Sequence, residues 1–225
     1  MAALLEPRLT AASLDWPSLD PTILYDLLRG EPTALAQEAP FTAHVFACVL
    51  TIGLRDADRQ TISLGQAVGL NRNELAALTR GWLPAAFARI NLSAERETTT
   101  IDDEEEQLRQ LLLQHRADAA PETLWLTAMV ARRSMSDDHL WQDLGLLDRD
   151  ELNRLMTERF PRLAARNASN MKWKKFFYRM LCEMEGFSLC AAPTCRECGD
   201  FDNCFGDESG ESALARIRRD GGRPL

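Results

Sequence analysis

One helical pattern occurs twice in this chain, and the repetition limits what the chain can fold into. Ser63–Pro84 reads SLGQAVGLNRNELAALTRGWLP, and His139–Pro161 reads HLWQDLGLLDRDELNRLMTERFP. The copies match at an offset of 76 positions, and of 77 after one insertion, at Leu64/Leu140, Gln66/Gln142, Gly69/Gly145, Leu70/Leu146, Arg72/Arg149, Glu74/Glu151, Leu75/Leu152, Leu78/Leu155 and Pro84/Pro161. A glycine between two short apolar segments is typical of one helix ending and another beginning. The repeat therefore predicts two related helical units.

The rest of the chain also has helical periodicity, and no segment shows the alternation of a strand. We predict a buried helix over Thr33–Leu54, capped by Thr33, and another apolar helix over Glu122–Arg133. One of them precedes each copy of the repeat. A long helix is predicted over Ser169–Glu185, ending at Gly186. The expected fold class is all-α, with a single helical domain of two related helical units followed by a C-terminal cysteine-rich metal loop.

Composition divides the chain into three parts. Residues 1–32 are rich in proline and turn residues and predict a loosely ordered N-terminal arm, with at most one short helix near Pro21–Leu28. Residues 33–186 form the all-α domain with both copies of the repeat. Residues 187–225 hold the cysteine-rich loop, a short C-terminal helix and a tail.

Five consecutive carboxylates, Asp102–Glu106, raise the question of a cation site. Acidic residues in the first turn of a helix face the positive end of its dipole, and a threonine just before them can cap it. We therefore interpret the run as the start of a helix capped by Thr100.

Four cysteines fall within CAAPTCRECGDFDNC, residues 190–204, with the spacing C-x4-C-x2-C-x5-C. The N-terminus shows no secretory signal, and in a reducing compartment clustered thiols hold metal or do redox chemistry more often than they form disulfides. A zinc site usually pairs two C-x2-C knuckles, and only one is present. The first three cysteines have the spacing of plant-type ferredoxins, whose fourth cysteine lies far downstream. Spacing alone favours an iron–sulfur cluster over zinc, with four ligands: Cys190, Cys195, Cys198 and Cys204.

Two further residues could add a ligand to such a metal. His139 opens the second copy of the repeat where the first copy has serine, and histidine offers a harder nitrogen ligand. Cys182 lies on the helix that leads into the cysteine motif. The simpler interpretation of each residue is structural, with His139 at a helix start and Cys182 in the core. We interpret Cys48, in the apolar run HVFACVL, as a core residue, and His44 and His115 as structural.

The helix before the motif, MKWKKFFYRMLCEMEGF, interleaves cations with aromatic residues. The simple interpretation is an amphipathic helix with a solvated basic edge. The functional interpretation is that its cations offset the charge of a thiolate-ligated cluster or attract an anionic metal source such as an oxyanion. These cations are Lys172, Lys174, Lys175 and Arg179.

The stretch LGQAVGLNRNELAALTR also resembles a helix-turn-helix, which would imply DNA binding. Its second helix has only Arg72 and Arg80 as cations against Glu74, and the net charge of −8 disfavours nucleic acid and anionic membranes. With 45% hydrophobic and 27% charged residues, and no apolar stretch long enough to cross a bilayer, the chain has an ordinary soluble composition. We expect a cytoplasmic protein with no nucleic-acid or membrane partner.

Several stretches resemble the NifQ family, which takes part in assembling the iron–molybdenum cofactor of nitrogenase. They are HLWQDLGLLDRDEL, FPRLAARN, MKWKKFFYRMLCEMEGFSLCAAPTCRECGDFDNCFG and GESALAR. The resemblance is close from about Leu124 to Arg216 and weaker back to about residue 35. Its most specific part is the C-x4-C-x2-C-x5-C motif, which this chain keeps without departure.

The resemblance implies an iron–sulfur cluster incorporating molybdenum, with the four motif cysteines as ligands. It also implies that metal from molybdate or another molybdenum source passes to the cofactor-assembly scaffold, with that scaffold and the nitrogenase iron protein as partners. A carrier of this kind is not an enzyme, so no catalytic residue is expected. Two other functions stay open, a cluster-based redox-sensing DNA-binding regulator and an interaction module stabilised by zinc.

Overall fold

The computed structural model describes residues 19–184, and every regular element in that range is a helix. The expected all-α class is therefore confirmed for these residues, whereas the cysteine-rich loop lies outside them. The elements are α1 (Pro21–Arg29), α2 (Ala34–Glu38), α3 (Pro40–Gln60), α4 (Leu64–Val68), α5 (Arg72–Trp82), α6 (Pro84–Phe87), the 3-10 turn η2 (Leu92–Ala94), α7 (Asp103–His115), α8 (Pro121–Ser134), α9 (Leu140–Asp143), α10 (Arg149–Arg159), α11 (Pro161–Arg166) and α12 (Trp173–Met184). No helix in this range is long and apolar enough to cross a membrane.

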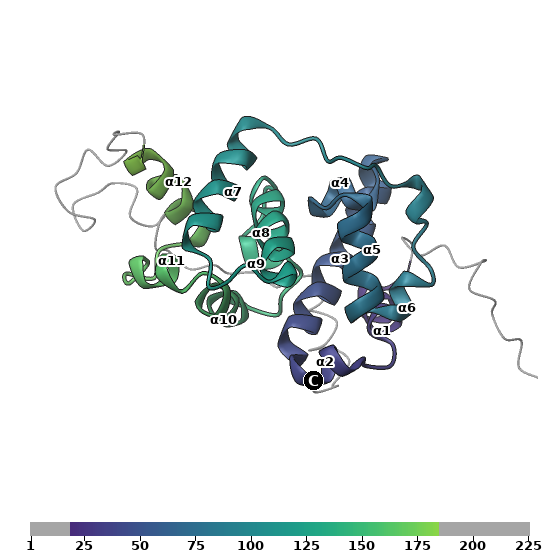
Figure 1. Ribbon diagram of the computed structural model, residues 1–225. Helices are drawn as coiled ribbons and strands as arrows, with labels where there is room; N and C mark the ends of the chain where they lie inside the picture. Colours follow the sequence, from purple (N-terminus) through teal and green to yellow (C-terminus); the bar gives the residue numbers. More distant parts are fainter. Residues whose placement is uncertain (1–18, 185–225) are drawn as a thin grey trace, which may run out of the picture.

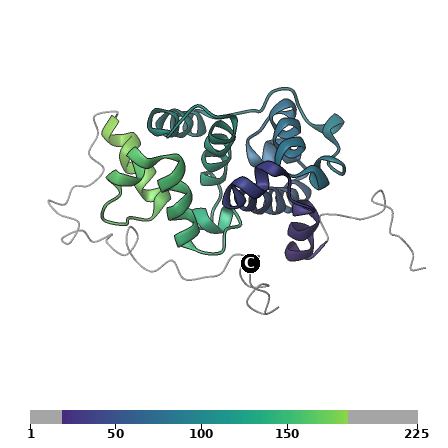
Figure 2. The same cartoon turned by 60° about the horizontal axis from the view of Figure 1, so that its bottom comes forward.

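The helices lie in two groups, α1–α6 on one side and α7–α12 on the other (Figures 1 and 2). In the first group α1 packs on α3 and α6, and α3 packs on α4. In the second group α7 packs on α8 and α11, and α8 packs on α9. The order α1-α3-α4-α5-α6 thus corresponds to α7-α8-α9-α10-α11, while α12 has no counterpart in the first group. This correspondence agrees with two related helical units.

The two copies of the repeat begin their helices in the same way. The backbone amides of Ser63 and His139 each donate to the side chain of the glutamine three positions on, both at 3.2 Å. The second helix of each copy begins after Asn71 or Asp148, whose side-chain oxygen accepts from the backbone amide three positions on, at 3.0 and 2.9 Å. Such caps satisfy amides that have no partner inside the helix. Matching sequence has therefore produced matching helix starts.

Gly69 and Gly145 end α4 and α9 with positive φ angles of 79° and 72°. A Cβ atom on Gly69 would lie 2.9 Å from the carbonyl oxygen of Ala128 in α8, and one on Gly145 would lie 2.9 Å from that of Cys48 in α3. Each unit therefore uses its repeat glycine to admit the backbone of the other unit's long helix. The contact between the units is reciprocal.

The sequence predicts one helix over Thr33–Leu54, and this prediction is wrong in two respects. Thr33 caps the short α2, accepting from the amide of Ala36 at 3.1 Å, and a separate helix begins at Pro40. Proline disfavours helical backbone in the residue before it, and Ala39 has φ −130° and ψ 69°. The second helix, α3, then continues past Leu54 to Gln60.

Two other helix starts differ from expectation. The acidic run does open a helix, but Asp102 caps it, accepting from the amide of Glu105 at 2.8 Å. The carbonyl oxygen of Thr100 instead accepts a hydrogen bond from Arg132 at 2.6 Å. The last helix begins at Trp173 rather than Ser169, after the positive φ of 55° at Asn170 interrupts the helical backbone.

The end of the expected N-terminal arm packs into the helical body. Helix α1 begins at Pro21, as predicted, and Asp20 caps it by accepting from the amide of Thr22 at 2.9 Å. Leu24 and Leu28 on this helix are fully buried in the core. Residues 19–32 are therefore part of the packed structure, in contrast to the loose arm expected there.

Candidate functional site

The four motif cysteines lie outside residues 19–184, so their geometry is not part of the structure described. Cys182 lies on α12, partly exposed and unbridged, eight positions before Cys190 in the sequence. His139 is partly buried at the start of α9. In residues 19–184 no three His, Cys, Asp or Glu side chains come together to hold a metal ion. A ligand role for His139 or Cys182 stays a prediction.

The cations of α12 are partly engaged within the protein. Lys174 Nζ donates to Asp143 Oδ2 and to the carbonyl oxygen of Ser136, both at 2.5 Å. Arg179 pairs with Glu183 one turn later at 3.1 Å. Lys175 is exposed, so among these residues it points most openly to solvent. Anion attraction by this helix stays a prediction, and Lys174 has a structural contact instead of a free charge.

Asp143 is the buried end of the contact that ties α12 to α9. Its side chain is only 6% exposed, and burial raises the pKa of its carboxyl group above the ordinary value, although the hydrogen bond and charge of Lys174 act in the opposite direction. The lysine therefore offsets part of the cost of burying this carboxylate. The helix that leads into the cysteine motif is anchored at this point.

A second contact holds α12 to α7. The hydroxyl of Tyr178 donates to Glu104 Oε1. Burial, and then the neighbouring carboxylate, raise the pKa of Tyr178 to about 12.

An open cleft of about 540 Å³ lies between the two units. Its walls are the C-terminal ends of α3 and α8 together with α4, α9 and the loop that joins α8 to α9. Asp143 lies in this wall, so the cleft and the α12 anchor share a residue. Most of the lining is polar, with four arginines and four aspartates: Arg55, Arg59, Arg132, Arg133, Asp56, Asp137, Asp138 and Asp143.

Two of the four arginines are structural. Arg132 donates to Glu105 Oε2 at 2.7 Å and to two carbonyl oxygens, those of Gln66 and Thr100, at 2.5 and 2.6 Å. Arg133 is 4% exposed, and donates to Asp56 Oδ2 at 2.6 Å and to the carbonyl of Asp143 at 2.7 Å. Both guanidinium groups donate their hydrogen bonds to oxygen atoms of the protein itself, so neither is counted as a group for binding a ligand.

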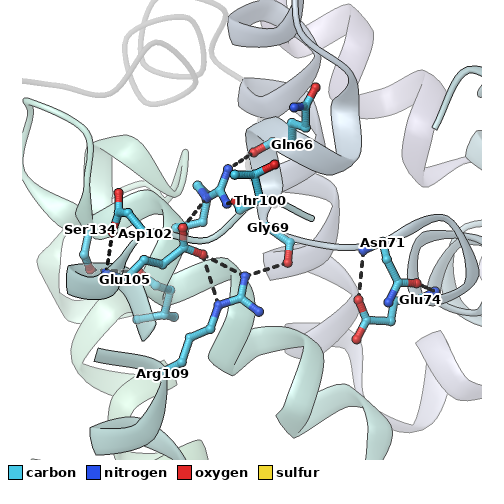
Figure 3. Close-up of polar contacts among 11 residues, drawn as sticks. Gln66, Gly69, Asn71, Glu74, Thr100, Asp102, Glu105, Arg109 and Ser134 are labelled. Atoms are coloured by element: carbon cyan, nitrogen blue, oxygen red, sulfur yellow. Dashed lines mark hydrogen bonds and ion pairs between the residues drawn. The ribbon is translucent and has the colours of Figure 1, made fainter. Parts of the chain in front are cut away.

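A buried carboxylate, Glu105, holds two arginines that reach across to the first unit (Figure 3). It is 2% exposed and accepts from Arg109 at 2.7 and 3.0 Å as well as from Arg132. Arg109 also donates to the carbonyl oxygen of Gly69 at 2.8 Å. A buried charge with several charge-assisted hydrogen bonds is stable, but it becomes costly when one partner is lost. This network holds α7 and α8 to the first unit.

Cys48 is a core residue, as interpreted from the sequence, and His44 has structural contacts, as expected. Cys48 is fully buried, and His44 is 7% exposed. His44 Nδ1 lies 2.8 Å from the hydroxyl of Tyr25, and its Nε2 lies 3.2 Å from Glu151 of α10. This histidine therefore connects α3 to α1 in its own unit and to α10 in the second unit. Cys48 is enclosed in the core and is not accessible to a metal ion from solvent.

Sequence reasoning did not find the cleft. Its walls come from two pairs of helices, α3 with α4 and α8 with α9, that lie far apart in the chain. The only signal was the pair Arg55 and Arg59, four positions apart on one helix, where like charges are unfavourable neighbours.

Comparison with known proteins assigns the chain to a family. The model of the NifQ family matches residues 45–206. The chain belongs to the NifQ family. It is 43% identical over 190 residues to the protein NifQ homolog of Sinorhizobium fredii, covering 84% of this chain and 82% of that protein. It is 37% identical over 175 residues to protein NifQ of Rhodobacter capsulatus, covering 78% of this chain and 96% of that protein.

A third relative is similar over a shorter part of the chain. Protein NifQ of Azotobacter vinelandii is 49% identical over 106 residues, which is 47% of this chain and 54% of that protein. No solved structure gives a significant match. The NifQ resemblance found in the sequence is therefore confirmed, and the matched residues include both the cleft and the cysteine motif.

Proposed function

We propose that this protein binds an iron–sulfur cluster, takes up molybdenum and donates it for assembly of the iron–molybdenum cofactor of nitrogenase. The observation that carries the proposal is the C-x4-C-x2-C-x5-C motif in a chain of the NifQ family. Thiolates are the protein ligands that hold such clusters, and four of them suffice for one cluster. The proposed ligands are Cys190, Cys195, Cys198 and Cys204.

Of the two cysteines outside the motif, the structure argues against one as a ligand. Cys48 is enclosed in the core, so it is not available to a cluster near the C-terminus. Cys182 is partly exposed near the end of α12, and remains a candidate for an additional ligand together with His139. When bound, the cluster would supply sulfur ligands to molybdenum, which is the cargo of the protein.

In this proposal the protein is a cytoplasmic metal carrier and not an enzyme. Its partners are the cofactor-assembly scaffold and the nitrogenase iron protein, and its molybdenum comes from molybdate or another molybdenum source. Helix α12, which precedes the cysteine segment in the sequence, is itself held to the helical body through Lys174 and Tyr178.

The test is anaerobic purification followed by analysis of iron, sulfide, molybdenum and zinc. We expect iron and molybdenum in the wild-type protein, loss of iron in Cys195→Ser, and retained iron in the matched control Cys48→Ala. His139→Ala should keep iron and lose molybdenum if the histidine is a ligand. Colourless wild-type protein with zinc and no iron would contradict the proposal and favour the zinc-stabilised module. Iron without molybdenum would favour the redox-sensing regulator.

A further inference from the structure

Two arginines of the cleft between the units are held less firmly by the fold than Arg132 and Arg133 are. Arg55 is partly buried, lines the cleft, and makes no hydrogen bond or ion pair with any residue in 19–184. Arg59 is exposed and lies 3.7 Å from Asp56, which is already bound by Arg133. Arginine offers several donors in a planar fork that matches oxyanions. Two arginines that lie four positions apart on α3 and line the same cleft are therefore suited to share an anion.

These two arginines lie on a part of α3 that the second unit lacks. Ile52 and Arg132 are equivalent, because each contacts the repeat glycine of the other unit. Eleven positions separate Ile52 from Ser63, but only seven separate Arg132 from His139. The difference of four positions is about one helical turn. The fold thus adds a turn that carries Arg55 and Arg59, and this turn forms one wall of the cleft.

The carboxylates of the cleft fall into two kinds. Asp56 and Asp143 are largely buried and are matched by Arg133 and Lys174. Asp137 and Asp138 are exposed, so water and salt screen their charge. An exposed acidic pair of this kind weakens an anion site without abolishing it.

We propose that this cleft binds a tetrahedral oxyanion of the molybdate class. Arg55 and Arg59 supply the charge, and Ser136 and Gln142 in the same lining offer neutral hydrogen-bonding groups. The choice of molybdate over other oxyanions rests on the proposed function. Asp143 lines the cleft and also pairs with Lys174 of α12. The anion would therefore bind close to the point where α12, the helix before the cysteine motif, is held to the helical body.

The experiment is equilibrium dialysis of the metal-free full-length protein against molybdate, with tungstate, sulfate and phosphate as competitors. We expect saturable binding of one molybdate per chain. Arg55→Gln should weaken it by about tenfold or more, because charge-assisted hydrogen bonds are lost. Arg59→Gln should weaken it less, since that side chain is exposed. The control Arg162→Gln, an exposed arginine of α11 outside the cleft, should leave binding unchanged.

The double variant Asp137→Asn/Asp138→Asn gives an effect of opposite sign. Removing the acidic pair should tighten molybdate binding, whereas weaker binding would overturn the proposal. Absence of saturable binding, or equal affinities of Arg55→Gln and Arg162→Gln, would also overturn it. Circular dichroism of each variant shows whether it is folded. Iron and sulfide analysis of the same variants tests the proposed function separately, because the cleft can bind an anion in a protein that holds no cluster.

Discussion

Replacing Gly145 with alanine tests the reciprocal contact between the units. Alanine at a φ of 72° costs about 1–2 kcal/mol, because its Cβ crowds the following carbonyl oxygen. That Cβ would also lie 2.6 Å from Ile52 Cγ1 and 2.9 Å from the carbonyl oxygen of Cys48. Overpacking of this kind adds about 1–3 kcal/mol. We therefore expect Gly145→Ala to lower the free energy of unfolding by about 2–5 kcal/mol.

Gly81→Ala is the matched control. Gly81 lies inside α5 at an ordinary helical φ, and the nearest atom to its added Cβ would be Leu35 Cδ1 at a comfortable 3.6 Å. Alanine is favoured over glycine within helices, so this variant should gain about 0.5–1 kcal/mol. Gly69→Ala should behave like Gly145→Ala, because its Cβ would meet α8 as closely as the Gly145 Cβ meets α3.

The assay is urea unfolding of the full-length protein with linear extrapolation to water. The predicted cost of a Cβ at these glycines is contradicted if Gly145→Ala and Gly69→Ala both have a free energy of unfolding within about 0.5 kcal/mol of the wild-type value, the range of an ordinary surface substitution. It is also refuted if Gly81→Ala is destabilised as much as they are.

Two further predictions concern buried carboxylates. Glu105→Gln should cost about 3–5 kcal/mol in urea unfolding, because it leaves Arg109 and Arg132 without their shared negative partner, whereas the exposed Glu106→Gln should change little. Because burial raises the pKa of Asp143, the folded protein binds the proton of this carboxyl group more tightly than the unfolded chain does. Protonation of Asp143 therefore stabilises the fold fully at a pH below the ordinary pKa. This stabilisation is lost as the pH rises through the raised pKa of the folded protein. Asp143→Asn should remove this pH dependence from urea unfolding curves measured at successive pH values, and the exposed Asp137→Asn should keep it; identical slopes for the two variants would contradict the assignment.

The helices could be predicted wherever a local signal decides them. Gly69 and Gly145 could be predicted as helix ends because glycine adopts the positive φ angles of such ends more readily than other residues do. The start of α7 was ambiguous, since Thr100 and Asp102 are both good caps. Arg132 decides between them by taking the Thr100 carbonyl oxygen, and this contact joins positions 32 residues apart. No local pattern contains that information.

Of the two candidate sites, one could be predicted from local sequence and the other could not. The cysteine motif is compact in sequence, so it was found there, together with the family resemblance. The cleft depends on which arginines remain unpaired after folding. Arg55 and Arg133 look alike in the sequence, yet Arg133 is bound to Asp56 and Arg55 is not. Only tertiary structure separates a structural arginine from an available one.

The exchange of glycine contacts has a consequence for how the halves can vary. An arrangement in which the same surface meets itself about a two-fold relation is isologous, as in a symmetric homodimer. When two identical chains form such a contact, every substitution appears in both copies. A single chain that contains both halves is free of that constraint, so one half can lengthen α3 and the other can carry α12 and the cysteines. In the proposed function, this asymmetry would let the added turn of α3 contribute to the anion cleft while the cysteine motif follows the second half alone.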